Sequence, residues 1–416
     1  MTVALVLSGG GARGAYEMGV LSVLLPELER RGERPTILVG TSVGAFNSAY
    51  LAARAHVPAA QLVEEALPLW SSIRHRDVLA PIVSRAALRR LGAYAGQLLG
   101  LSRPRIDAVL DPEPLPRTLA RLVSFEDIRE NVASRRVTVA VAATSAYSGR
   151  TVVFHAGGVS PDADPVRQID YVAAELHADH VRASGAIPTV FPAVHVQAPE
   201  RARGWYFDGG TRLNTPIKPA LALGAERVVV IGLNSIAPAP GDRLAAELPP
   251  NLFEGAAQIV QALLVDRLVE DVRELAEENL PGHDERRVPY IFVSPRGRES
   301  VGEIATDVYR ARYSGLRGLL RDRDLALLGR IVAAGDAALN GELLSALFFA
   351  PELLRRLIEL GKTDAQAWLS EEHEEGLWQV GPLPDQARRP ASAESPRSAQ
   401  HTSRQIEARS RIEVSR

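Results

Sequence analysis

Residues 3–21 read VALVLSGGGARGAYEMGVL and decide the fold, because three glycines separate a short apolar run from a longer amphipathic one. Val3–Leu7 is rich in valine and leucine, as in a buried parallel strand. Residues 15–31 then carry apolar side chains at helical spacing, and Gly32 supplies a stop. The stretch therefore predicts a strand, a glycine-rich turn and a helix. The apolar helix positions are Met18, Leu21, Leu24, Leu25 and Leu28.

A second unit of the same kind follows at residues 36–53, TILVGTSVGAFNSAYLAA. Residues 36–39 predict a strand, and the residues after Gly44 predict a helix. Strand, helix, strand and helix in succession predict a mainly parallel sheet covered by helices on both faces. Further strands are predicted at residues 137–142, 151–154, 205–207, 227–233 and 288–293.

The glycines after the first strand fit two kinds of site. Gly9, Gly11 and Gly14 have the G-x-G-x-x-G spacing of a dinucleotide-binding unit. Such a unit needs an acidic residue at the end of the second strand to hold the ribose, and here the nearest carboxylate, Glu33, precedes that strand. A non-catalytic nucleotide- or lipid-binding module therefore stays as an alternative that lacks its second anchor.

A serine takes the place of that acidic residue. Ser42 lies between Gly40 and Gly44 in the G-x-S-x-G pattern of a nucleophile elbow, directly after a predicted strand and before a helix. Because the carboxyl ends of neighbouring parallel strands share one edge of a sheet, we expect the amides of Gly10 and Gly11 to face the carbonyl oxygen that Ser42 attacks. Arg13 either adds positive charge there or holds the loop, and we favour the second role.

A general base is predicted at Asp208. It ends an aromatic strand in RGWYFDGG, and Gly209 and Gly210 let the backbone turn and leave the carboxylate uncovered. An aspartate in an ordinary tight turn is the structural alternative. A second enzyme hypothesis is a histidine-dependent α/β-hydrolase with Ser42, Asp208 and His283 as its triad.

Together these motifs resemble the patatin-like phospholipases. GGGARG (9–14) resembles the family's oxyanion loop, GTSVG (40–44) its nucleophile elbow, DGG (208–210) its catalytic aspartate turn, and ASGAIPTVFPAV from Ala183 a block beside its active site. The resemblance implies a three-layer α/β/α sandwich, and a Ser–Asp dyad that hydrolyses lipid acyl esters without histidine, metal or cofactor. It also implies Ser42 as nucleophile and Asp208 as base. Gly9, Gly10, Gly11, Arg13 and Gly14 would form the oxyanion loop.

Composition limits the other classes of function. The 416 residues carry a net charge of −2, which argues against a nucleic-acid partner bound over the whole surface. The chain has no cysteine, so disulfides, thiolate metal sites and cysteine nucleophiles are excluded. We expect no signal peptide and no transmembrane helix, and therefore a cytoplasmic enzyme.

The organisation along the chain completes the predictions. Residues 1–300 are expected to form the catalytic domain, with a helical, lid-like segment at about 60–124; residues 301–370 a helical C-terminal extension; and residues 381–416 a disordered tail. A long amphipathic helix is expected at 251–279. The arginines and leucines of residues 85–101 predict either a surface helix packed on the sheet or a peripheral membrane contact. These side chains are Arg85, Arg89, Arg90, Leu88, Leu91, Leu98 and Leu99.

Overall fold

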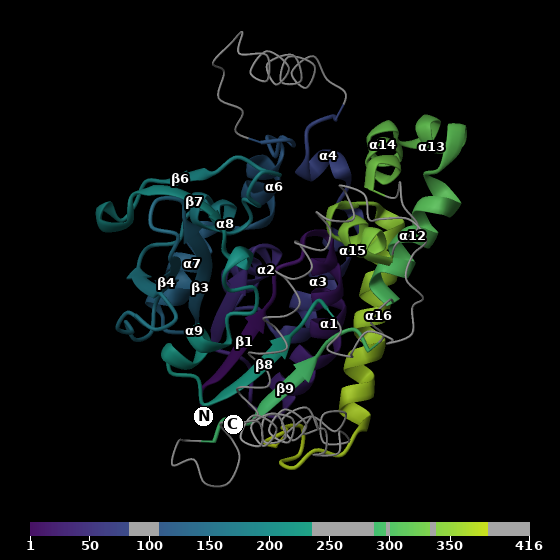
Figure 1. Ribbon diagram of the computed structural model, residues 1–416. Coiled ribbons are helices and arrows are strands. Elements are labelled where there is room, and N and C mark those ends of the chain that lie inside the picture. The colour runs from purple at the N-terminus through teal and green to yellow at the C-terminus, as the bar shows by residue number, and fades with distance from the viewer. Residues whose placement is uncertain (83–107, 235–286, 297–299, 333–337, 382–416) are drawn as a thin grey trace, which may run out of the picture.

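The computed structural model describes residues 1–82, 108–234, 287–296, 300–332 and 338–381 (Figure 1). Within these ranges nine strands form one sheet, in the order β5-β4-β3-β2-β1-β8-β9, with the β6–β7 pair attached to β3. The strands are β1 (Val3–Leu7), β2 (Ile37–Thr41), β3 (Thr138–Ser145), β4 (Thr151–Ala156), β5 (Ile169–Ala173), β6 (Val194–Val196), β7 (Gly204–Asp208), β8 (Arg227–Ile231) and β9 (Tyr290–Val293).

The centre of the sheet is parallel. β1 pairs with β2 on one side and with β8 on the other, and in this register Leu7 lies opposite both Gly40 and Ile231. The carboxyl ends of these three strands therefore meet at one edge, where open α/β sheets bind their ligands. β4 and β7 run antiparallel to β3.

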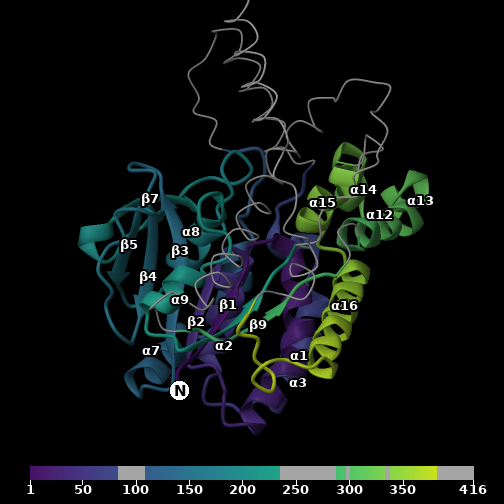
Figure 2. The same ribbon diagram turned by 60° about the horizontal axis from the view of Figure 1, so that its bottom comes forward.

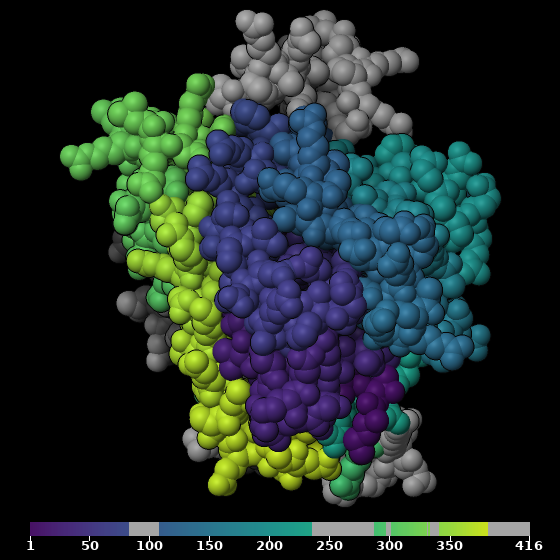
Figure 3. Space-filling model, turned by 180° about the vertical axis from the view of Figure 1, so that it is seen from behind, coloured from purple at the N-terminus to yellow at the C-terminus, as the bar shows by residue number. Residues whose placement is uncertain are grey.

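Helices cover both faces of the sheet. α1 (Gly14–Arg30), α3 (Ala59–Ser72) and α16 (Pro351–Ser370) pack over the face seen in Figure 3, and α9 (Ile217–Ala222) packs on β1, β2 and β8 from the other face. The remaining elements of this part are η1 (Gly11–Arg13), α2 (Val43–Ala53), α4 (His75–Val78), α6 (Leu115–Leu122), α7 (Phe125–Ala133), α8 (Ala178–Ser184), η2 (Glu200–Ala202) and η3 (Gly209–Thr211).

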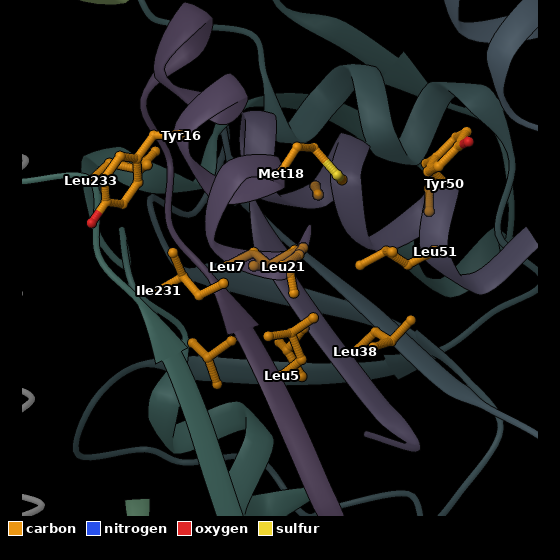
Figure 4. Packing of buried hydrophobic residues seen from close by; sticks show 14 of the residues in the cluster. Leu5, Leu7, Tyr16, Met18, Leu21, Leu38, Tyr50, Leu51, Ile231 and Leu233 are labelled. Carbon is orange, nitrogen blue, oxygen red and sulfur yellow. The ribbon is translucent and has the colours of Figure 1, made fainter. Parts of the chain in front are cut away.

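The core lies between the parallel strands and the first two helices (Figure 4). Leu5 and Leu7 of β1 and Leu38 of β2 are packed with Leu21 of α1 and Leu51 of α2, and all five are buried. Each such leucine stabilises the fold by roughly 1.5–3 kcal/mol relative to an exposed one. The apolar side chains that recur along the predicted strands and helices are therefore those that pack the helices onto the sheet.

The C-terminal helices are α12 (Ser300–Arg312), α13 (Gly315–Arg321), α14 (Arg323–Val332), α15 (Ala338–Leu347) and α16. α16 lies directly against α1, where a Cβ on Gly19 would be 2.2 Å from the Ile358 carbonyl oxygen and one on Gly361 would be 2.3 Å from that of Tyr16. The Tyr16 hydroxyl also donates to Asp364 Oδ2 at 2.8 Å. Two glycines thus allow close backbone contact between the first helix and the last.

The α/β sandwich and the helical C-terminal region were both predicted correctly from the sequence. Two strands were not expected: β5 is a short edge strand of mixed polarity, and β6 has three residues. None of the described helices combines the length and apolarity needed to span a bilayer. The expected helix at 251–279, the stretch at 85–101 and the tail after Gly381 lie outside the described residues. The described part of the segment at 60–124 consists mainly of α3, α4 and α6.

Candidate active site

Ser42 stands in a strained turn between β2 and α2. Its φ of 55° and ψ of −121° are rare for a residue with a side chain, and such strain is stored mostly at functional sites. The glycines on either side allow the turn. A Cβ on Gly40 would lie 2.1 Å from the Gly44 carbonyl oxygen, and one on Gly44 would lie 2.3 Å from that of Leu7. The G-x-S-x-G spacing therefore corresponds to two close backbone contacts.

Asp208 ends β7 and is held by its own turn. Its backbone amide donates to the Ala186 carbonyl oxygen at 2.8 Å, and the Gly210 amide donates to its Oδ1 at 2.7 Å. In the sheet Asp208 lies opposite Ala143 of β3, while a Cβ on Gly209 would lie 2.4 Å from the Ala142 carbonyl oxygen. This close approach of the two backbones explains why a glycine follows the aspartate at position 209.

The structure brings Ser42 and Asp208 together. The Asp208 side chain is 96 % buried, and this burial raises the pKa of its carboxyl group to about 6. Hydrogen bonds from the Ser42 side chain and from the Gly210 amide work in the opposite direction, because they stabilise the carboxylate. The result is a carboxylate at neutral pH that is a stronger base than an ordinary aspartate and lies beside a serine hydroxyl.

The glycine loop after β1 lies next to the serine. A Cβ on Gly9 would be 3.1 Å from that of Ser42, and the Gly9 amide donates to the Asn214 carbonyl oxygen at 3.1 Å. No described residue accepts a hydrogen bond from the amides of Gly10 and Gly11. Gly11 has a φ of +60°, where a side chain is strained. The loop therefore offers two donors that have no acceptor among the described residues. Gly14 lets the loop pack closely on Val43 and Trp70.

Arg13 is buried and holds this loop to the C-terminal helices. Its Nε donates to Ser345 Oγ at 2.7 Å, and its guanidinium forms an ion pair with Glu342 Oε2 at 2.8 Å. It also donates to Asn234 Oδ1 and to the Glu342 carbonyl oxygen. The partners of its side chain among the described residues all lie on α15 or directly after β8. This geometry matches the second of the two roles considered for Arg13, that of holding the loop.

Ser184 is a site residue to which the sequence analysis assigned no role. Its Oγ accepts a hydrogen bond from the Ser42 amide at 2.8 Å and donates to the Ala142 carbonyl oxygen at 2.6 Å. It thereby ties the nucleophile elbow to β3. The ASGAIP motif indicated that Ser184 lies near the site. It could not indicate which backbone group the serine contacts, because that depends on long-range packing.

A buried polar network under the site was also missed. Asn47 of α2 donates to Glu17 Oε2 at 2.6 Å and to the Gly14 carbonyl oxygen at 3.2 Å, and it accepts from Trp70 Nε1 at 3.0 Å. Complete burial raises the pKa of Glu17 well above its usual range, while hydrogen bonds from Asn47 and the Ser8 backbone partly oppose this. The network joins the start of α1, which follows the glycine loop, to α2, which begins directly after Ser42.

Two of the described histidines, His180 and His195, are held by contacts of their own. Both ring nitrogens of His180 are hydrogen-bonded to the backbone, at His177 N and the Ala198 carbonyl oxygen, and its ring packs on Phe154. His195 packs edge-on against Trp205. His283, the candidate of the triad hypothesis, lies outside the described ranges. Within those ranges no group of three histidine, aspartate or glutamate side chains is placed to hold a metal ion.

The four motifs fall within one known family. Residues 5–221, slightly more than half of the chain, match the family described as patatin-like phospholipase. The chain belongs to the patatin-like phospholipase family. Asn234, Glu342 and Ser345, which bind Arg13 in this patatin-like phospholipase, lie beyond the matched residues.

Two solved structures are similar to this patatin-like phospholipase. VipD from Legionella pneumophila is 14% identical with a TM-score of 0.31, over 88% of this chain and 66% of VipD. Human GIVD cytosolic phospholipase A2, in complex with methyl gamma-linolenyl fluorophosphonate, is 14% identical with a TM-score of 0.36, over 88% of this chain and 57% of its own. The match thus spans less than two thirds of either chain. No curated protein matches the sequence.

Proposed function

We propose that the protein is a serine hydrolase of lipid acyl esters, of the phospholipase A or lysophospholipase type, with Ser42 as nucleophile and Asp208 as general base. One observation carries the proposal. A serine in a strained elbow lies beside a buried aspartate, whose pKa its side chain lowers, next to a loop with two amides that have no described acceptor. Family membership supports a lipid substrate.

In the first step the Ser42 Oγ attacks the carbonyl carbon of the ester, and its proton moves to the Asp208 carboxylate. The carbonyl oxygen becomes an oxyanion, which the amides of Gly10 and Gly11 stabilise by hydrogen bonds. The intermediate collapses when the bond to the alcohol breaks and Asp208 returns the proton to the leaving oxygen. An acyl group is then bound to Ser42, and the alcohol or lysolipid is free.

In the second step water takes the place of the serine hydroxyl. Asp208 accepts a proton from the water as its oxygen attacks the acyl carbonyl, and the same amides stabilise the second oxyanion. Collapse then breaks the ester bond to Ser42, whose oxygen takes the proton back from Asp208. The products are a fatty acid and the enzyme in its starting state.

The test is labelling with a fluorophosphonate probe together with hydrolysis of a soluble fluorogenic ester. We expect the probe to modify Ser42 in the wild-type protein, and Ser42→Ala and Asp208→Asn each to lower hydrolysis by roughly 10³-fold or more. His283→Ala is the control for the triad hypothesis and should stay within about threefold of wild type. Equal labelling of Ser42→Ala protein, or loss of activity in His283→Ala, would contradict the dyad.

A membrane contact through residues 85–101 stays a prediction. Arg85, Arg89 and Arg90 would meet anionic headgroups at roughly 1 kcal/mol each, which gives reversible attachment. Vesicle co-sedimentation of the triple Gln variant tests this segment, and unchanged binding would remove it from the proposal without affecting the dyad.

A further inference from the structure

The short helix α13 exposes an unusual amount of apolar surface. Leu316 is 80% exposed and Leu320 88%, and Leu319 beside them is 37% exposed. These are three of the four exposed leucines in the part of the chain that the structure describes. Gly318 faces inward, where a Cβ would lie 1.9 Å from the Tyr313 carbonyl oxygen. The glycine lets the helix close against the turn that precedes it, and the three leucines are exposed to solvent, as on an interaction surface.

Exposed arginines lie within and on either side of α13 in the sequence. The exposed side chains of Arg312, Arg317 and Arg323 form no ion pair with any described residue. The two aspartates that follow α13 are used by the protein itself: Asp322 Oδ1 accepts from the amide of Leu325 at 3.0 Å, and Asp324 Oδ1 accepts from that of Ile82 at 2.9 Å. In the sequence, the exposed leucines are therefore flanked by exposed arginines that form no ion pair with a described residue.

This surface lies at the site's end of the molecule. Figures 1 and 2 place α13 at the end toward which β8 and β9 run, and Figure 3 shows α12–α14 standing out as a corner of the molecule. α13 packs on α14, α14 packs on α15, and α15 contacts η1 in the glycine loop. A surface that touches α13 therefore meets the molecule at the end that holds Ser42.

We propose that α13 docks the protein on an anionic phospholipid surface, with Leu316, Leu319 and Leu320 in the acyl boundary and Arg312, Arg317 and Arg323 at the phosphates. Leucine beside arginine is the composition that interfacial helices use for this purpose. A second copy of the chain fits less well, because a two-fold contact through this helix brings like charges together. The inference rests on the proposed function in one respect, that a lipid surface holds the substrate.

The experiment measures flotation of full-length protein with vesicles, in a Ser42→Ala background so that the lipid stays intact. The vesicles are phosphatidylcholine alone or with about one third phosphatidylglycerol. Leu316→Ser with Leu320→Ser should lower partitioning to mixed vesicles by about tenfold or more. Arg317→Gln with Arg323→Gln should lower it on the order of fivefold per arginine, for vesicles that contain phosphatidylglycerol only.

The matched control is Val159→Ser with Arg135→Gln, which removes an exposed apolar side chain and an exposed arginine at the opposite end of the sheet. Arg135 precedes β3 and Val159 follows β4. Because these strands are antiparallel, the start of β3 lies beside the end of β4, and both residues are at that end of the sheet. This variant should partition like the parent protein. Equal partitioning of all three variants would overturn the proposal.

Two other measurements separate the outcomes. One outcome in light scattering is a dimer that is lost in the leucine variant while vesicle binding is unchanged. In that case the surface is a contact between copies of the chain, and the lipid assignment is wrong. Hydrolysis of a soluble ester by protein that retains Ser42 tests the proposed function separately. Its absence would count against the dyad and leave the vesicle result in place.

Discussion

Asp208→Asn should make the protein more stable while it removes activity. A buried carboxylate is disfavoured in the fold, which is why burial raises its pKa from 3.8 to about 6. The unfolded chain releases the proton first, so wild-type stability falls as pH rises from about 4 to 6. The shift in pKa between the unfolded and folded states corresponds to a loss of about 3 kcal/mol in the free energy of unfolding at pH 7, and about half of that at pH 5. An asparagine keeps the acceptor for the Gly210 amide and carries no charge to bury.

Urea unfolding followed by tryptophan fluorescence, at several pH values between 5 and 8, measures this effect. The variant should exceed wild type by about 2–3 kcal/mol at pH 7, and the gap should roughly halve at pH 5. Asp162→Asn changes an exposed carboxylate and should stay within about 0.5 kcal/mol of wild type throughout. A gap that does not depend on pH, or a less stable Asp208→Asn protein, would refute the reasoning.

Four further predictions concern the site and its support. Because Asp208 must be ionised to accept a proton, kcat/KM for a soluble ester should fall about tenfold per pH unit below about pH 6, and an acidic limb centred near pH 4 would contradict this. Ser184→Ala removes the acceptor of the elbow amide and should lower kcat by about 10-fold to 100-fold with KM nearly unchanged; equal changes in both would indicate a binding role. Arg13→Gln breaks a buried ion pair and should lower the free energy of unfolding by about 2 kcal/mol or more, as measured in urea. Gly361→Ala should cost about 1–3 kcal/mol by the same measurement, whereas Gly204→Ala, where a Cβ meets nothing nearer than 4.0 Å, should cost less than this, and equal losses would remove the helix contact as the cause.

The sequence predicted the elements whose signals are local. The glycine turn and the G-x-S-x-G string each follow a strand and precede a helix, so the sheet's edge and the serine's place on it followed from parallel pairing alone. The aspartate turn was recognisable from its two glycines. That Ser42 and Asp208 form one site as catalytic partners stays a prediction until the variants are measured.

Other features depend on partners far away in the chain. Ser184 contacts the elbow amide across 142 residues, and nothing in its own surroundings indicates which donor it meets. The raised pKa of Glu17 arises from complete burial, whereas the sequence shows a glutamate in the first turn of a helix. The edge strands β5 and β6 are short, and their pairing depends on β4 and β7 being in place.

The hold on Arg13 has a consequence for synthesis on the ribosome. The motifs from Gly9 to Gly210 emerge early, yet Ser345, which holds the glycine loop through Arg13, follows it by 332 residues. At about 5–20 residues per second a ribosome needs roughly 15–65 s to make that interval. During this time the nascent chain carries Ser42 and the glycine loop without α15, which braces the loop through Arg13. The loop therefore gains this support only after residue 345 has emerged from the ribosome.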